Sequence, residues 1–120
     1  LMTSAAVPKS QRISGIVIDA REHAVDPSMS PEVIDMQGNL VYGTISYSRS
    51  KAVNRGPVGY AYSMDDRNVS QRVGSNPLFV EAVGSLDDDV YITSMDAAKV
   101  REAEKSFGVL SNCRVMLLLQ

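Results

Sequence analysis

The sequence is poor in the residues that most often build metal and redox sites: it has one cysteine, Cys113, one histidine, His23, and no tryptophan. One cysteine excludes an intrachain disulfide and the zinc sites that use several thiolates. Cys113 enters an apolar segment with no histidine near it, which favours a small buried hydrophobe over a nucleophile. His23 lies among Asp19, Glu22 and Asp26, but because no second histidine supports a metal ligand or a base, we favour a surface histidine. We therefore expect no metal, no cofactor and no catalytic residues.

The chain also lacks a charge excess of either sign and any long hydrophobic run. Its 12 basic and 14 acidic residues give a net charge of −2, which provides no electrostatic basis for nucleic-acid binding. The longest apolar run, residues 115–119, is far shorter than the roughly 20 residues that span a bilayer, so no transmembrane segment is expected. The first residue is Leu1 and not methionine, which favours a processed product.

What the sequence does contain is typical of one globular domain. With 120 residues, of which 44% are apolar and 22% charged, the chain can bury a core without cross-links. Residues 1–12 have no hydrophobic period and predict an amino-terminal arm. Residues 13–120 alternate strand-like and helix-like segments and predict a single α+β domain.

The β-branched run at residues 13–20 predicts a buried central strand, because it is apolar on both faces until it ends. Asp19 and Arg21 follow at that end, and we expect them to form a structural ion pair that fixes the next loop. Gly38 can supply the positive φ of a tight turn and predicts a β-hairpin around it. Six further strands are predicted, at residues 32–36, 40–46, 58–62, 78–83, 90–93 and 114–119.

Two matching signals predict helix starts. Ser63 with Asp66, and Thr93 with Asp96, fit the pattern in which a hydroxyl caps a helix and an acid three residues later complements the helix dipole. We therefore predict two amphipathic helices, starting near Ser63 and Ser94. In the predicted architecture both helices pack on a single mixed β-sheet.

The two helix starts belong to a weak internal repeat. Ser63-Met64-Asp65 returns as Ser94-Met95-Asp96, each time after a strand-like run and before a glycine, a Ser-Asn pair and a further apolar strand. Two such units would place both helices on the same face of one sheet. Because the identities are few and the spacings differ, shared helix-start chemistry explains the pattern equally well, and both interpretations stay open.

The most basic segment of the chain is residues 47–57, which carries Arg49, Lys51 and Arg55. Either a short helix or a loop fits this segment. It has no glycine-rich cradle for a phosphate, so a solvated face or a subunit contact is the favoured interpretation.

The acidic counterpart is Asp87, Asp88 and Asp89, whose spacing does not fit an EF-hand and predicts a solvated turn between two strands. If the protein assembles, we expect the basic segment of one copy to meet this acidic turn of another. We also expect Met2 and Val7 in the arm to dock on a neighbouring copy, although a frayed terminus is the simpler interpretation.

Short motifs follow in a defined order along nearly the whole chain: Ser14-Gly15-Ile16-Val17-Ile18-Asp19-Ala20-Arg21, Pro27-Ser28-Met29-Ser30-Pro31, Asp35 to Tyr42-Gly43, Val58-Gly59-Tyr60-Ala61, Arg72-Val73-Gly74, Asn76-Pro77-Leu78, Asp96-Ala97-Ala98-Lys99 and Cys113-Arg114-Val115. Their order resembles bacterial cell-envelope proteins related to the flagellar outer-membrane lipoprotein FlgP. The resemblance implies an exported protein of the periplasm, the outer membrane or the cell surface. It also implies assembly with copies of itself and with other envelope or flagellar components.

The sequence departs from that family at three points. It has no amino-terminal cysteine to lipidate, it lacks an additional amino-terminal region, and His23 replaces an expected small residue. The first two departures weigh against a membrane anchor and a flagellar role. Two functions follow: a non-enzymatic structural protein that self-assembles into rings or filaments, and, as the alternative, a monomeric periplasmic ligand-binding or accessory domain.

Overall fold

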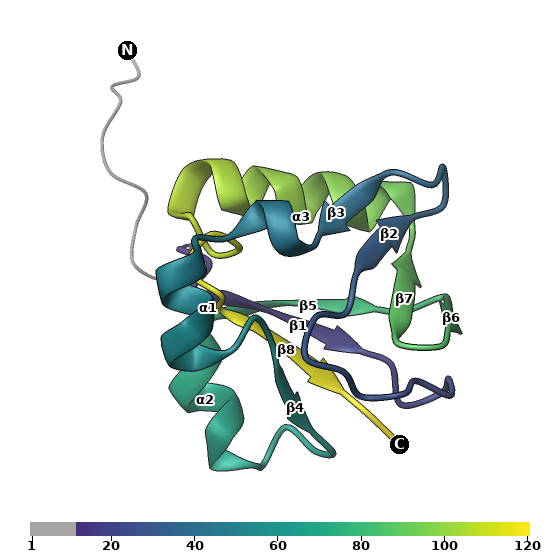
Figure 1. Cartoon of the computed structure of the whole chain (residues 1–120), viewed down its shortest axis with the longest axis horizontal. Helices are drawn as coiled ribbons and strands as arrows, with labels where there is room; N and C mark the ends of the chain where they lie inside the picture. Colours follow the sequence, from purple (N-terminus) through teal and green to yellow (C-terminus); the bar gives the residue numbers. More distant parts are fainter. Residues whose placement is uncertain (1–11) are drawn as a thin grey trace.

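A computed structural model describes residues 12–120, which form two four-stranded β-sheets and three α-helices (Figure 1). The predicted α+β class is confirmed. The prediction of a single sheet is wrong, because the two short hairpins of the chain pair with each other and not with the central strand. Strand-forming patterns report which face of a strand is buried, and they do not report which strands pair.

The first sheet is all parallel and has the order β4 (Gly59–Ala61), β8 (Val115–Leu118), β1 (Gly15–Asp19) and β5 (Pro77–Glu81). The prediction that β1 is a buried inner strand is confirmed. Its residues are apolar on both faces because both faces are covered: Ile16 and Ile18 face the main core, and Val17 faces a smaller core under α2. β8 is likewise an inner strand, and all four of its residues are buried.

The second sheet is mixed and has the order β3 (Leu40–Tyr42), β2 (Val33–Asp35), β7 (Asp89–Ile92) and β6 (Gly84–Leu86). The predicted hairpin of β2 and β3 is confirmed, with Gly38 at a positive φ of 85° in its turn. The sequence did not predict β6, which pairs antiparallel with β7.

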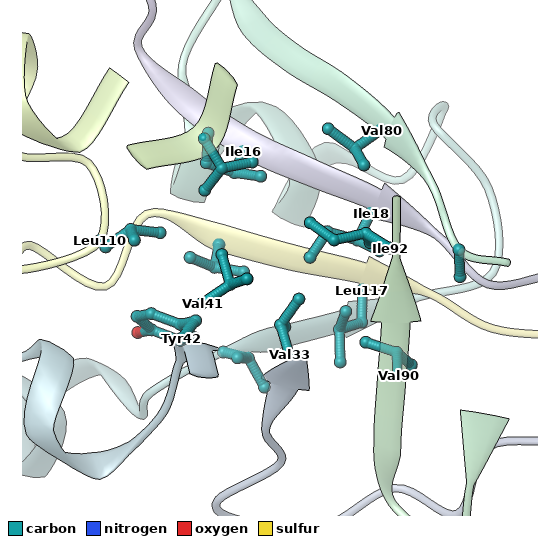
Figure 2. Close-up of a cluster of buried hydrophobic side chains, with 14 of the residues drawn as sticks. Ile16, Ile18, Val33, Val41, Tyr42, Val80, Val90, Ile92, Leu110 and Leu117 are labelled. Atoms are coloured by element: carbon teal, nitrogen blue, oxygen red, sulfur yellow. The ribbon is translucent and has the colours of Figure 1, made fainter. Parts of the chain in front are cut away.

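The main core lies between the two sheets. Figure 2 shows Ile16, Ile18 and Leu117 of the first sheet on one side and Val33, Val90 and Ile92 of the second sheet on the other. All of these side chains are almost fully buried. Burial of branched aliphatic side chains on this scale is the main stabilising contribution to a domain of this size.

The longest helix, α3 (Ser94–Phe107), starts and ends as the sequence predicts. The Thr93 Oγ1 accepts the Asp96 backbone N–H at 3.1 Å, and the helix ends at Gly108 in the left-handed conformation, with a φ of 65°. Ala97 and Val100 are fully buried on the face that meets the main core. The amphipathic pattern of this helix and its end signals therefore sufficed to predict its bounds and its buried face.

The other helices are shorter, α1 (Arg49–Arg55) and α2 (Arg67–Val73), and a 3₁₀ turn (Thr44–Ser46) precedes α1. α2 starts later than predicted. Its cap is Asp66, whose carboxylate accepts the Asn68 N–H at 2.9 Å, while the Ser63 Oγ accepts the Asp65 N–H in the turn before the helix. An aspartate is as good a cap as a serine, so either residue of this turn fits the start of a helix.

The expectation that both predicted helices cover one face of one sheet is wrong. α2 covers the outer face of the first sheet, where Val69 and Val73 pack on Val17 and Met116. α3 lies on the opposite face and contributes to the main core. The segment from β4 through α2 to β5 stays within one sheet, whereas the segment from β7 through α3 to β8 joins the two sheets. The structure therefore favours shared helix-start chemistry over duplication.

Candidate functional site

Asp19 and Arg21 lie together at the end of β1. The Arg21 guanidinium donates Nε–H to Oδ1 and Nη2–H to Oδ2 of Asp19, both at 2.9 Å, and the Arg21 backbone N–H donates to Oδ1 at 3.1 Å. The hydrogen bonds from the Arg21 side chain lower the pKa of the Asp19 carboxyl below 3.8. The side chain of Asp19 is 20% exposed and that of Arg21 is 41% exposed, so water screens this pair.

Asp19→Ala is therefore expected to lower the free energy of unfolding by about 1 kcal/mol or less, because the donors it frees are solvated. A group whose pKa is lowered by folding stabilises the folded state above its unfolded pKa. Its contribution is lost as the pH falls below 3.8 toward the folded value. Urea unfolding of the two proteins at pH 7 and pH 3 measures the difference. A loss above about 2 kcal/mol at pH 7 would show a buried role for the carboxylate.

The loop after β1 borders a cavity at the carboxyl edge of the parallel sheet, which is where open α/β sheets commonly bind ligands. The cavity holds about 260 Å³, and it is lined by residues 23–27 together with Tyr62, Leu119 and Gln120. The Nε2 of His23 lies 3.1 Å from the Ala82 carbonyl oxygen, so this ring ties the loop to the end of β5.

The structure shows no grouping of the kind that holds a metal. Within residues 12–120, no three His, Cys, Asp or Glu side chains come close enough together to bind an ion. Cys113 is fully buried ahead of β8, as predicted for a small hydrophobe.

The basic segment folds as α1, a helix that buries none of its seven residues. Beside it lies a largely apolar groove of about 520 Å³, here called the α1 groove, which is lined by Met29, Thr44, Tyr47, Arg49, Ala52, Val53 and Pro57. Met29 and Val53 are strongly exposed, and so is Ile45, which follows Thr44 in the 3₁₀ turn. Exposed apolar side chains gathered beside a concave surface are typical of an interaction site.

The charges on α1 do not follow from helix stability. Its first turn contains Arg49 and Lys51 and no acid, although the partial positive charge at a helix start favours acidic residues. Lys51 Nζ donates a hydrogen bond to the Asn112 side-chain oxygen, while Arg55 lies in the last turn, where a cation is favourable. Arg49 and Lys51 therefore give the first turn of α1 a positive charge that the helix dipole does not favour.

The acidic turn, here residues 87–89, lies where β6 meets β7, as predicted for a turn between strands. Asp87 and Asp88 form the turn itself, and Asp89 is the first residue of β7. Asp88 Oδ2 accepts the Ser28 hydroxyl at 2.7 Å, and Asp89 Oδ1 accepts the Glu32 backbone N–H at 3.0 Å. Asp87 has a φ of 55°, and its carbonyl accepts the backbone N–H of Asp26, which lies in the loop between β1 and β2. These bonds hold the loop before β2 against the hairpin. Asp87 is exposed, whereas Asp88 and Asp89 are half-buried and hydrogen-bonded, so the turn is less solvated than predicted.

The structure does not bring the basic helix and the acidic turn together within one chain. Figure 1 shows α1 at one end of the longest axis and the hairpin of β6 and β7 at the other. A contact between Arg49, Lys51 or Arg55 and the acidic turn can therefore form only between two copies. Met2 and Val7 lie outside the described residues.

Two charged residues that the sequence analysis missed hold this architecture. Asp35 is the one charged side chain buried among the described residues. It accepts the backbone N–H groups of Asn39 and Gln37, each at 2.9 Å, and pairs with Arg101 at 3.2 Å. These bonds, led by the one from Asn39, lower its pKa. An aspartate at the start of Asp35-Met36-Gln37-Gly38-Asn39 is a local signal for a turn whose backbone N–H groups bond to the carboxylate. This signal could have identified Asp35 from the sequence.

The second residue is Arg72, in the last turn of α2. Its Nη1–H groups reach the carbonyls of Gly56 at 3.1 Å and Cys113 at 2.9 Å, and Nη2 donates to the carbonyl of Arg55. The carbonyl groups come from the end of α1 and from the loop before β8, so Arg72 fixes both segments against α2. No local sequence pattern marks these long-range bonds.

The fold thus defines an α+β domain in which a parallel sheet is covered by α2 on one face and by α3 and a mixed sheet on the other. Residues 15–120 match the family described as Treponema pallidum Tp0624, second domain, and the chain belongs to this family. No curated protein matches the chain. The family match supports a bacterial relationship and shows no link to FlgP. Within residues 12–120, no helix has the length and apolar character needed to cross a membrane.

Proposed function

We propose that this domain is a non-enzymatic assembly module of the bacterial cell envelope, in which copies bind head to tail through the α1 groove. The observation that carries the proposal is α1 itself: a helix with no buried residue, beside an apolar groove, with Val53 75% exposed. Such a short helix has little stability of its own, and although Arg72 and Asn112 hold it to the domain, a partner that covers its exposed apolar side chains would stabilise it further.

The acidic turn is the surface that best matches α1 in charge. Because the two surfaces lie at opposite ends of the longest axis of the domain, each copy can bind the next copy through one of them. Such a contact joins two different surfaces, and contacts of this kind build rings when the rotation closes and filaments when it does not. The charged part of the contact is screened by salt, whereas the apolar part is not.

The location in the cell envelope is supported by the motifs that resemble FlgP-related proteins, which assemble with copies of themselves. The family of this chain is described by a domain of a Treponema pallidum protein, which is compatible with a role in a bacterial envelope. Other envelope or flagellar components are further candidates for partners.

The alternative is a monomeric periplasmic ligand-binding or accessory domain. The observation that favours it is the cavity beside His23, which occupies the edge of the parallel sheet where ligands commonly bind. The two functions make opposite predictions for mass, because a ligand-binding monomer does not associate as its concentration rises.

Val53→Asp tests the assembly surface. A carboxylate in the middle of the α1 groove would be buried without a partner in the assembly, so the dissociation constant is expected to rise at least about tenfold. Sedimentation velocity of the variant and the unmodified protein at matched concentrations measures this change.

Met95→Asp is the matched control, because Met95 is 73% exposed on α3 and lies outside the groove. It is expected to leave association unchanged. Equal association of Val53→Asp and the unmodified chain would exclude the α1 groove as the interface.

A further inference from the structure

A second pocket, polar and separate from the α1 groove, lies where the end of α1 meets α2 and β4, three elements that Figure 1 shows together at one side of the domain. It holds about 410 Å³, which falls within the range of about 300–1,000 Å³ common for small-molecule sites. Its lining includes two arginines, Arg55 and Arg72, and two side-chain amides, Asn68 and Gln71. Among the described residues, no carboxylate lines it.

The two guanidinium charges of this pocket are not balanced by an acid. The ion pairs within residues 12–120 all use other residues. Partial burial lowers the pKa of Arg72, and the charge of Arg55 lowers it further, so the two positive charges lie close to each other. Two neighbouring cations without an acid attract a ligand that carries two negative charges.

The guanidinium of Arg72 is oriented by the protein itself. Its bonds to the carbonyls at the end of α1 and at Cys113 use both N–H groups of Nη1 and one of Nη2. Of the five N–H groups of an arginine, Nε–H and one Nη2–H are left without a partner in the described part of the chain. Arg21 binds the carboxylate of Asp19 through the same two nitrogens. Arg72 can therefore donate two hydrogen bonds to the oxygens of an anion.

The backbone around Arg72 favours this arrangement. A Cβ at Gly59 would lie 2.6 Å from the Arg72 Nε and 2.8 Å from the Met116 Cε, so a glycine is what leaves room for the guanidinium beside β4. Free carbonyls at a helix end repel an anion, but here the carbonyls of Arg55 and Gly56 accept hydrogen bonds from Arg72. The end of α1 is thereby made compatible with a negatively charged ligand.

We propose that this pocket binds a small soluble phosphate monoester, with the phosphate group between Arg55 and Arg72. Such a group carries a charge of about −1.5 to −2 at pH 7 and has three acceptor oxygens, so it matches two guanidinium groups. The exposed amides of Asn68 and Gln71 can bond to hydroxyl groups on the rest of the ligand. Met116, the aliphatic side chain of the lining, is almost fully buried, which leaves little surface for a lipid tail.

Titration of the full chain with glycerol 3-phosphate at low ionic strength, followed by heteronuclear NMR, tests the site. The Arg72 Nε–H signal and the side-chain amide signals of Asn68 and Gln71 are expected to shift together and to saturate. Glycerol has the same hydroxyl groups without the charge and is expected to shift none of them. The absence of a saturable shift with glycerol 3-phosphate, or equal shifts with glycerol, would overturn the proposal.

Arg55→Gln removes one of the two charges and keeps the bond between Arg72 and α1, because that bond uses the Arg55 carbonyl. The dissociation constant for glycerol 3-phosphate is expected to rise at least about tenfold, because a charge-assisted hydrogen bond is lost. Arg67→Gln is the matched control, since Arg67 is an exposed arginine of α2 that lies outside the pocket. It is expected to bind as the unmodified chain does. Equal weakening by both variants would reduce the effect to net charge and would exclude the site.

Val53→Asp separates this site from assembly through the α1 groove. Because Val53 does not line the polar pocket, the variant is expected to bind glycerol 3-phosphate as the unmodified chain does. Loss of binding in Val53→Asp would contradict a site that is complete within one chain. A chain that binds glycerol 3-phosphate and stays monomeric at all concentrations would support the pocket and contradict the assembly proposal.

Discussion

Gly15→Ala is expected to lower the free energy of unfolding by about 3 kcal/mol. A Cβ at Gly15 would lie 2.5 Å from the Val73 Cβ and 2.6 Å from the Val73 Cα. Val73 is fully buried at the end of α2, and its carbonyl accepts the Ser14 hydroxyl at 2.6 Å. Because backbone meets backbone here, the helix itself must shift to make room.

Gly84→Ala is the matched control, since Gly84 also lies in a strand but has just the Tyr91 Cβ, at 4.0 Å, near its open side. The free energy of unfolding of this variant is expected to lie within about 0.5 kcal/mol of that of the unmodified protein. Chemical unfolding followed by circular dichroism measures both. Equal stability of the two variants would show that α2 does not pack on β1 as closely as described.

Arg72→Ala is expected to lower the free energy of unfolding by about 3 kcal/mol, because three backbone carbonyls lose one shared donor. Arg72 is half-buried, and this partial burial lowers the pKa of its guanidinium. A Cβ at Gly59 would lie 2.6 Å from the Arg72 Nε, so the side chain packs directly against β4.

Arg72→Lys retains the positive charge but cannot present a planar fork to three carbonyls, so it is expected to recover less than half of the loss. Arg67→Ala, at the exposed start of the same helix, serves as the control and should change stability by less than about 0.5 kcal/mol. If Arg72→Ala were as mild as Arg67→Ala, the described bonds would contribute nothing to stability. Because Arg72 fixes the end of α1, Arg72→Ala is also expected to weaken association through the α1 groove.

Local sequence patterns sufficed to predict the elements whose burial can be inferred from their own residues. The apolar runs of β1 and β8, the turn at Gly38 and the capped amphipathic α3 were all predicted, because each pattern reports its own exposure. The start of α2 was misplaced because Ser63 and Asp66 are competing caps within one turn.

Long-range geometry decided what the sequence did not predict. The division into two sheets depends on β2 pairing with β7, two strands far apart in the chain. The α1 groove is formed by Met29 from the loop before β2 and by Val53 from α1, so the basic residues were identified while the apolar surface beside them was not.

Self-association through complementary ends of the domain is the central proposal, and the oligomeric mass of the unmodified chain tests it most directly. Sedimentation equilibrium from low micromolar to near-millimolar protein is expected to give a mass that rises with concentration, and that falls in part when salt is added. A mass that stays at that of one chain over the whole range would contradict assembly and favour the ligand-binding alternative.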